Sequence, residues 1–177
     1  MAHPAQQEYC LSVKEKFPEY FKNKKVLDVG SLNINGDNKY LFEDCDYAGL
    51  DIITGRNVDI VSIAHEFEAS EETYDVIIST EAFEHDMYLE KTLANIVRML
   101  KGGGLFLFTC ATSGRGEHGT AKHDSVASPT SQVPGWCDYY KNLIEENIRE
   151  LLDVDNIFRD YEFNTLWVDL RFWGIKK

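Results

Sequence analysis

The stretch "VLDVGSLNINGD", Val26 to Asp37, joins a short apolar run to a glycine and a polar turn. The run, preceded by two lysines, lacks polar alternation, which is typical of a strand buried on both faces of a parallel sheet. In open α/β sheets the turn after the first strand is where the backbone approaches a bound nucleotide. The residues around Gly30 therefore decide both the fold and the ligand.

Two phosphate-binding loops are excluded by the residues that follow Gly30. A dinucleotide loop, G-x-G-x-x-G, needs a second glycine so that the pyrophosphate can approach the backbone. Leu32 stands at that position, which argues against an NAD-dependent oxidoreductase. A P-loop has the form GxxxxGK[ST], but Gly36 comes one residue late and is followed by Asp37, whose charge repels phosphate.

Strand-like and helix-like segments alternate along the rest of the chain. Strands are expected at 24–30, 47–52, 58–63, 74–79 and 105–111, and helices at 8–21, 87–100 and 142–152. Asp86 is expected to cap the second helix and the "KGGG" run to stop it. Two further strand-like runs, 157–163 and 166–177, predict a terminal hairpin that turns at Asn164 and Thr165. The pattern predicts an α/β fold: a doubly wound, Rossmann-like, mostly parallel sheet of seven strands with a C-terminal antiparallel hairpin and helices on both faces.

The length and the composition of the chain suit one globular domain spanning residues 1–177. The chain has 44% hydrophobic and 27% charged residues, and its net charge of -12 argues against nucleic acid or an anionic membrane surface as a partner. We expect an N-terminal helical segment at 1–24 and a long irregular loop at 112–140. The oligomeric state stays open.

The chain shows no targeting signal that we can identify. Its beginning, "MAHPAQQEYC", lacks a basic region followed by an apolar one, and no apolar run reaches the ~18 residues of a membrane span. The four cysteines are scattered without a CxxC pair, which is typical of reduced thiols. We therefore expect a cytoplasmic protein.

A nucleoside that carries an amino-acid tail fits the first turn better than a phosphate does. Gly30 lets such a tail lie against the backbone, and Asp28 can orient its ammonium group. Asp51 ends the second expected strand about 20 residues further on, where a carboxylate accepts hydrogen bonds from ribose hydroxyls.

The segments "VLDVGS", "GLDI" and "YDVIISTEAFEH", in this order and spacing, resemble the class I S-adenosylmethionine-dependent methyltransferases. The resemblance covers nearly the whole chain, including the terminal hairpin. It implies S-adenosyl-L-methionine as cofactor, S-adenosyl-L-homocysteine as product, and in-line methyl transfer to an acceptor. Because the chain is short and has no appended substrate domain, we expect a small-molecule or small protruding acceptor.

The resemblance also implies roles for single residues. Gly30 and Ser31 would line the methionine part of the cofactor, Asp51 would hold the ribose, Ile52 would pack on the adenine, and the backbone of Ala64 would contact the ring. Asp28 and Glu81 are expected to border the cofactor as well.

The chain departs from the family pattern at two places. Ile63 stands where many members have an acidic residue beside the adenine. The first loop lacks the usual GxGxG, so we expect it to turn through Asn33 and Asn35 in the left-handed region.

Glu81, Glu84 and His85 follow the fourth expected strand and form one candidate catalytic group. At i, i+3 and i+4 they would share one face of a helical turn. The group looks like the ExxEH arrangement of metal-dependent methyltransferases that act on hydroxyl groups, with His118 or His123 as a further ligand. Many metal-free relatives carry an acid and a histidine here to cap a helix or border the cofactor. We favour that alternative, assign no metal, and expect His85 near the cofactor as a catalytic candidate.

The 112–140 loop holds the other candidate group. It leaves the carboxyl end of the fifth expected strand, so we expect it to cover the site as a lid. His118, flanked by Gly116 and Gly119, is the candidate general base. Trp136, Tyr139 and Tyr140 would either wall an acceptor pocket or pack the following helix onto the sheet.

Two alternatives to an ordinary methyltransferase stay open. One is a catalytically silent module that binds a nucleoside or a partner on the same fold. The other is a metal-assisted O-methyltransferase. The sequence does not decide whether oxygen, nitrogen or carbon accepts the methyl group.

Overall fold

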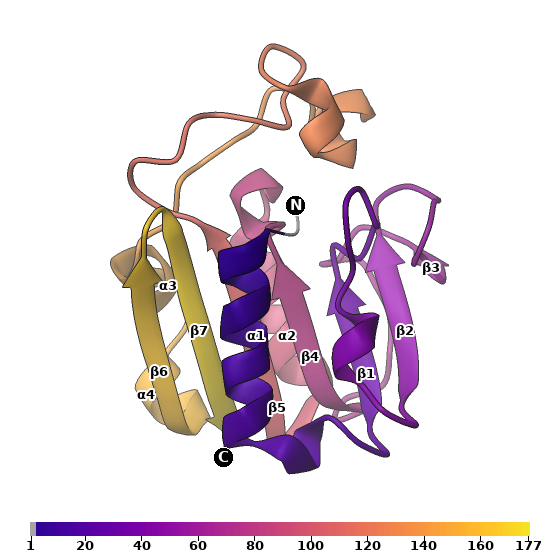
Figure 1. Cartoon of the computed structure of the whole chain (residues 1–177), viewed down its shortest axis with the longest axis vertical. Helices are drawn as coiled ribbons and strands as arrows, with labels where there is room; N and C mark the ends of the chain where they lie inside the picture. Colours follow the sequence, from indigo (N-terminus) through magenta and orange to yellow (C-terminus); the bar gives the residue numbers. More distant parts are fainter. Residues whose placement is uncertain (1–2) are drawn as a thin grey trace.

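The computed structural model describes residues 3–177, which form one seven-stranded sheet in the order β3-β2-β1-β4-β5-β7-β6 (Figure 1). The strands are β1 (Lys25–Val29), β2 (Asp46–Asp51), β3 (Ile60–Val61), β4 (Tyr74–Thr80), β5 (Leu100–Ala111), β6 (Phe158–Leu166) and β7 (Asp169–Lys176). β1 pairs in parallel with β2 and β4, and β7 runs antiparallel between β5 and β6. The predicted fold class, terminal hairpin included, is confirmed.

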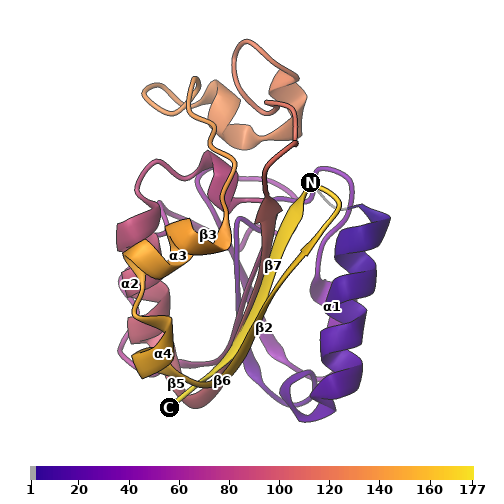
Figure 2. The same cartoon turned by 90° about the vertical axis from the view of Figure 1, so that its left-hand side faces the viewer.

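Helices cover both faces of the sheet, as predicted. α1 (Pro4–Lys16) lies on one face, while α2 (Leu89–Met99), α3 (Glu145–Leu151) and α4 (Val154–Ile157) lie on the other (Figure 2). Short 3-10 turns join them: η1 (Pro18–Tyr20), η2 (Lys39–Leu41), η3 (Phe83–His85), η4 (Ser125–Ala127) and η5 (Pro129–Gln132). Within residues 3–177 no helix combines the length and apolar character needed to span a membrane.

The strand order creates a crevice next to β1. From β1 the chain moves outward through β2 and β3, and it then returns to place β4 on the other side of β1. The connections that leave β1 and β4 therefore run in opposite directions. In open α/β sheets this reversal is the point at which ligands bind, beyond the carboxyl ends of the strands.

Alternating side chains along the strands divide the core into two layers. Leu105 and Leu107 of β5 pack with Val13 of α1 on one face. Phe106 and Phe108 pack on the opposite face with the helix side chains that include Leu93. Because both faces are covered, the central strands read as continuous apolar runs, which is why the sequence identifies them.

The expected start of the second helix is wrong by two residues. The N-cap of α2 is Tyr88 and has no side-chain capping bond. The Asp86 carboxylate still accepts hydrogen bonds from the Tyr88 N–H and the Thr92 hydroxyl, so it satisfies donors of this turn from outside the helix. Asp86 therefore accepts hydrogen bonds near the start of the helix, but it is not the N-cap residue that was predicted.

Three other boundaries also differ. The "KGGG" run does not follow α2 as a loop, since β5 begins at Leu100 directly after Met99. β3 is only two residues long. The terminal hairpin turns at Trp167 and Val168 rather than at Asn164 and Thr165; these two pair within the ladder, and Trp167 has φ +60°.

The α2 layer gives a stability prediction. Leu93 has no exposed surface, so the substitution Leu93→Ala is expected to lower the free energy of unfolding by about 2–5 kcal/mol through lost burial and a residual cavity. Leu11 on α1 is 42% exposed, and Leu11→Ala is expected to change the free energy of unfolding by less than about 0.5 kcal/mol. Urea unfolding followed by circular dichroism measures both, and equal losses in the two variants would contradict the assigned layer.

Candidate functional site

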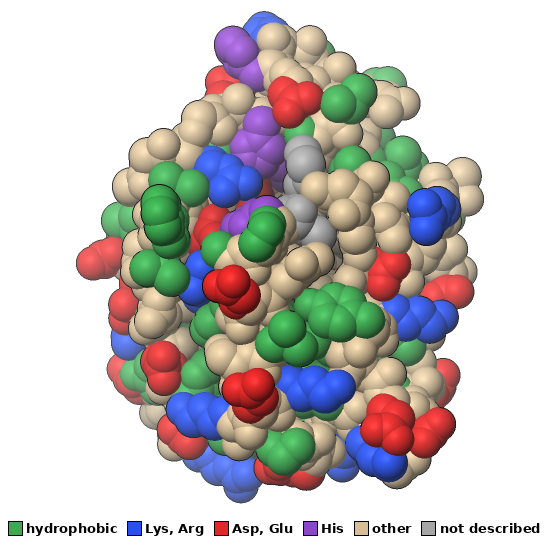
Figure 3. Space-filling view, in the orientation of Figure 1, with side chains coloured by type: hydrophobic (Ala, Val, Ile, Leu, Met, Phe, Trp, Pro, Cys, Tyr) green, Lys and Arg blue, Asp and Glu red, His purple; other side chains and the backbone are tan. Residues whose placement is uncertain are grey.

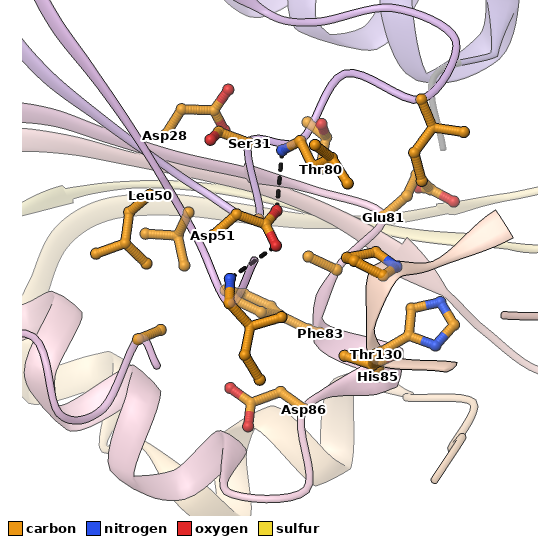
Figure 4. A pocket seen from close by; sticks show the side chains of 18 of the residues that line it. Asp28, Ser31, Leu50, Asp51, Thr80, Glu81, Phe83, His85, Asp86 and Thr130 are labelled. Atoms are coloured by element: carbon orange, nitrogen blue, oxygen red, sulfur yellow. Dashed lines mark hydrogen bonds between the residues drawn. The ribbon is translucent and has the colours of Figure 1, made fainter. Parts of the chain in front are cut away.

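A cavity lies beyond the carboxyl ends of β1, β2 and β4, at the reversal in strand order (Figure 4). The space between its walls amounts to about 920 Å³, part of it open to solvent. Its walls come from residues 28–38, 50–52, 62–64 and 80–86 and from the 112–140 loop. All the predicted cofactor residues line it, namely Asp28, Gly30, Ser31, Asp51, Ile52, Ala64 and Glu81.

Gly30 brings the backbone after β1 against the backbone after β4. It has φ +78°, and a Cβ atom at this position would lie 2.4 Å from the Cβ of Ala82. Its N–H donates to the Leu50 carbonyl at 2.9 Å, which ties the loop to β2. A larger residue would meet both a strained dihedral and a clash, so glycine is required here.

The first loop turns differently from the expectation. Neither Asn33 nor Asn35 has a positive φ, whereas Gly30 and Gly36 do. The Asn33 side chain instead accepts the Gly36 N–H at 2.9 Å and donates to the Asp37 carboxylate at 2.6 Å. The prediction that Asn33 and Asn35 adopt left-handed backbone conformations is therefore wrong. The hydrogen bond between the Gly36 N–H and the Asn33 side chain supports the turn instead.

Ser31 lines the cavity, but its polar groups form hydrogen bonds within the protein. Its hydroxyl donates to the Asn57 carbonyl at 2.9 Å, and the Asn57 side chain donates back to the Ser31 carbonyl at 3.0 Å. The Ser31 N–H donates to Leu50. The residue therefore shapes the cavity wall through a reciprocal contact with the loop after β2.

Asp51 is held by the backbone at the end of β2. One carboxylate oxygen accepts the Leu32 N–H at 2.9 Å and the other accepts the Ile52 N–H at 2.7 Å (Figure 4). Burial raises the pKa of Asp51, and these hydrogen bonds act in the opposite direction. Since a carboxylate oxygen has more than one acceptor position, each oxygen still has capacity for a ligand hydroxyl.

Asp28 lies deeper and is held by side chains from distant parts of the chain. The Tyr47 hydroxyl donates to it, and the Asn38 side-chain amide lies 3.3 and 3.4 Å from its two oxygens. Asn38 also contacts Thr80 and accepts from Gln6 of α1. Burial raises the pKa of Asp28 to about 7, although the hydrogen bonds from Tyr47 and Asn38 lower it.

One part of the cavity wall is apolar. Ile52, Ile63 and Ala64 line it. The side-chain amide of Asn95 on α2 donates to the Ala64 carbonyl at 2.8 Å and so fixes this segment to the helix. His65 packs against Tyr88 in a tilted arrangement, with ring centroids 4.7 Å apart, and does not line the cavity.

Glu81 borders the cavity at the end of β4 with an unusual backbone. Its φ is +53°, which is uncommon for a residue other than glycine and turns its carboxylate inward. One oxygen accepts the Thr109 hydroxyl at 2.8 Å. The other lies 3.5 Å from the His3 imidazole and 3.6 Å from the Arg115 guanidinium. Contacts with Asp169 and Glu81 raise the pKa of His3 to about 9.

Residues of the 112–140 loop cover the cavity. Figures 1 and 2 show this segment standing above the strand ends, and Ala127, Pro129, Thr130 and Trp136 line the cavity from it. On the face drawn in Figure 3, histidine side chains appear only in the upper part of the molecule. Trp136 meets the edge of Tyr88 at a centroid distance of 5.6 Å.

The ExxEH residues do not share one face. Glu81 turns toward Thr109 and Arg115, while Glu84 and His85 belong to η3 and meet His118 of the 112–140 loop. His85 lines the cavity, whereas His118 does not.

Glu84, His85 and His118 lie among aromatic and apolar groups. The two imidazole centroids are 5.2 Å apart, and the Tyr140 ring contacts both. Burial raises the pKa of Glu84 above its usual range, with the charge of Glu81 adding to this effect. Burial lowers the pKa of His85 to about 3 and also lowers that of His118, so both imidazoles are neutral near pH 7.

Several functional neighbours were not found from the sequence. Asn38 and Tyr47 form hydrogen bonds with Asp28. Thr109 forms one with Glu81, which His3 and Arg115 flank. Local spacing carries no signal for contacts between residues this far apart in the chain. Only the polar residues inside otherwise apolar runs, such as Thr109 in β5, are visible as exceptions.

The sequence of the chain matches a known domain family. A family model described as a methyltransferase domain matches residues 1–168. A search of curated proteins gives no significant match.

Solved structures share the fold at low identity. Phosphoethanolamine N-methyltransferase 2 of Haemonchus contortus, in complex with S-adenosyl-L-methionine, has a TM-score of 0.61 and 21% identity over 90% of this chain, which spans only 38% of that enzyme. The 1,6-didemethyltoxoflavin-N1-methyltransferase of Burkholderia thailandensis, with its substrate and S-adenosylhomocysteine bound, has a TM-score of 0.62 and 14% identity over 100% of this chain and 92% of that one. A SAM-dependent methyltransferase of Aquifex aeolicus has a TM-score of 0.63 and 14% identity over 99% and 94%.

The buried Asp28 gives a pH prediction. Its pKa is raised from 3.8 to about 7 in the folded protein, so its contribution to stability is fully present below about pH 4 and is lost as pH rises to about 7. The substitution Asp28→Asn removes this loss. The stability of the variant relative to wild type is therefore expected to increase between pH 4 and 7 and then to level off.

Thermal unfolding at a series of pH values measures this difference. Asp46→Asn, at the exposed start of β2, is the control for a carboxylate removed from the surface. A difference for Asp28→Asn that varies with pH no more than that of the control would contradict the raised pKa of Asp28.

Proposed function

The chain belongs to the methyltransferase-domain family, and on that premise we propose that its cavity binds S-adenosyl-L-methionine and delivers the methyl group to a small acceptor. The observation that carries the proposal is the position of Asp51. It ends β2 beside the reversal in strand order, and both of its oxygens are fixed by backbone N–H groups and retain acceptor capacity.

The charge of the cavity favours this cofactor over one with phosphate groups. The described residues that line the cavity include five carboxylates, those of Asp28, Asp37, Asp51, Glu81 and Asp86, and neither lysine nor arginine. A pyrophosphate would meet carboxyl groups there, and no lysine or arginine side chain among these lining residues. A sulfonium nucleoside with an ammonium group is attracted instead.

We place the cofactor in the orientation that the loops support. The ribose hydroxyls would donate to Asp51, and the adenine would lie against Ile52, Ile63 and Ala64. The methionine tail would follow the backbone at Gly30, where no side chain intervenes. Its ammonium group would lie toward Asp28 and favour the charged form of that carboxylate.

Methyl transfer is a displacement at the sulfonium carbon, so the protein must align the acceptor and exclude water. The end of β4 and the 112–140 loop are the surfaces available for this. His85 lines the cavity as a neutral imidazole whose lowered pKa makes it a weak proton acceptor, so it would help to position the acceptor, and His118 packs against its ring. The loop would act as the lid over the acceptor.

The acceptor we propose is small and carries no phosphate group. Phosphoethanolamine is the acceptor named for the Haemonchus enzyme, and the present cavity has neither lysine nor arginine among its described lining residues to hold such a phosphate group. The overall charge of -12 also disfavours nucleic acid as the acceptor. The rival, a silent binding module, has no specific observation in its favour.

Removal of the Asp51 carboxylate tests the cofactor site. Calorimetric titration of S-adenosylhomocysteine into Asp51→Ala is expected to show binding weaker by roughly tenfold to hundredfold, because a charged hydrogen-bond acceptor is lost. Asp46→Ala, at the exposed start of the same strand, is the matched control and is expected to bind like wild type. NAD is expected not to bind.

Two outcomes would contradict the proposal. Wild-type protein that is folded but does not bind S-adenosylhomocysteine would remove the cofactor assignment. Cofactor binding without turnover, measured as S-adenosylhomocysteine formed with a panel of small amines and hydroxyl compounds, would favour the silent module.

A further inference from the structure

Glu84, His85 and His118 form a largely buried cluster in which most of the side-chain polar atoms have no hydrogen-bond partner. Both oxygens of Glu84, both ring nitrogens of His85 and Nε2 of His118 have no hydrogen-bond partner. Glu84 has no exposed surface and His85 is 3% exposed. Buried polar side chains in native proteins nearly always have partners, so this group of atoms points to a shared ligand.

The geometry of the cluster suits one small ligand. One ligand atom from each residue lies within 4.8 Å of the other two. Around a tetrahedral ion with bonds of about 2.1 Å the donor atoms are about 3.4 Å apart. An ion bound between the three side chains would draw these atoms closer, toward that separation.

His118 is oriented for this role by a backbone contact. Its Nδ1 lies 3.0 Å from the Gly116 carbonyl, so Nδ1 carries the proton and Nε2 presents a lone pair to Glu84. Histidines that bind metals usually donate their other ring N–H in this way, which fixes the tautomer. Gly119 allows the loop to approach, since a Cβ there would lie 2.6 Å from Cε1 of His85.

We propose that Glu84, His85 and His118 bind a divalent first-row transition-metal ion. Two imidazoles and one carboxylate suit Zn²⁺, Fe²⁺ or Mn²⁺, whereas Mg²⁺ and Ca²⁺ select oxygen ligands. The set differs from the ExxEH arrangement because Glu81 is turned away to Thr109. It replaces the sequence-based expectation that no metal is bound.

A second group of possible metal ligands in the structure is less suited to an ion. His3, Glu81 and Asp169 also bring ligand atoms within 4.8 Å of one another. There, Arg115 lies 3.2 Å from Asp169 and 3.6 Å from Glu81, and His3 contacts both carboxylates. Those charges are already paired within the protein, whereas Glu84 has no cationic partner of this kind among the described side chains.

The ion would join two separate parts of the molecule. Glu84 and His85 belong to η3 of the domain body, while His118 belongs to the 112–140 loop. Metal binding would hold the loop closed over the cavity that His85 lines. With three protein ligands, positions are left for an acceptor oxygen, and this last consequence rests on the proposed function whereas metal binding itself does not.

Titration of chelator-treated full-length protein with Co²⁺ and Zn²⁺ tests the proposal. We expect one equivalent of Co²⁺ to bind with visible ligand-field absorption, and Zn²⁺ to displace it. His118→Ala and Glu84→Gln are expected to weaken binding at least tenfold, while His123→Ala, an exposed histidine of the same loop, is expected to bind like wild type. Zn²⁺ is also expected to slow proteolysis within 112–140 in wild type and not in His118→Ala.

Absence of stoichiometric Co²⁺ binding by folded wild-type protein would overturn the inference. Equal affinity in His118→Ala, or an equal loss in His123→Ala, would do so too, since the ion would then bind elsewhere. Far-ultraviolet circular dichroism establishes that each variant folds. S-adenosylhomocysteine titration of the same samples separates failure of the metal site from failure of the proposed function.

Discussion

Parallel pairing of β1 with β4 is the constraint on which the site depends. It sets side by side two strand ends whose connections leave in opposite directions, and the loops that follow must pass each other closely. Gly30 and Ala82 meet at that passage, where even one added methyl group has no room. The cavity exists because these loops diverge immediately afterwards, so sheet topology and a single glycine together define its floor.

Carboxylates are concentrated around this cavity, and their environments give them different properties. Asp51 is held by backbone N–H groups at the end of its own strand, whereas Asp28 relies on Tyr47 and Asn38. Glu81 is flanked by cationic side chains from the N-terminus and the covering loop. A protein that buries so much like charge gives up stability for it, which is typical of residues kept for binding rather than for folding.

The sequence predicts the structure well where the physical determinants are local. Continuous apolar runs identified the central strands, and a glycine and an acid at strand ends identified one side of the cavity. It failed where distant residues decide the outcome: no local pattern shows that Asn38 supports Asp28, or that Glu81 has a positive φ. The turn of the hairpin is predicted at the wrong residues because Trp167 has a positive φ. Tryptophan rarely adopts this conformation, so its presence does not indicate a turn.

The two outer strands of the sheet are protected against association with other chains in different ways. β3 offers only Ile60 and Val61, too short a ladder for a stable added strand. β6 is long, but Arg159, Asp160 and Glu162 are exposed along it. Short edges and charged edges both discourage strand addition. Neither border therefore presents the long, flat, apolar backbone that seeds aggregation, even though the strands between them are among the most apolar segments of the chain.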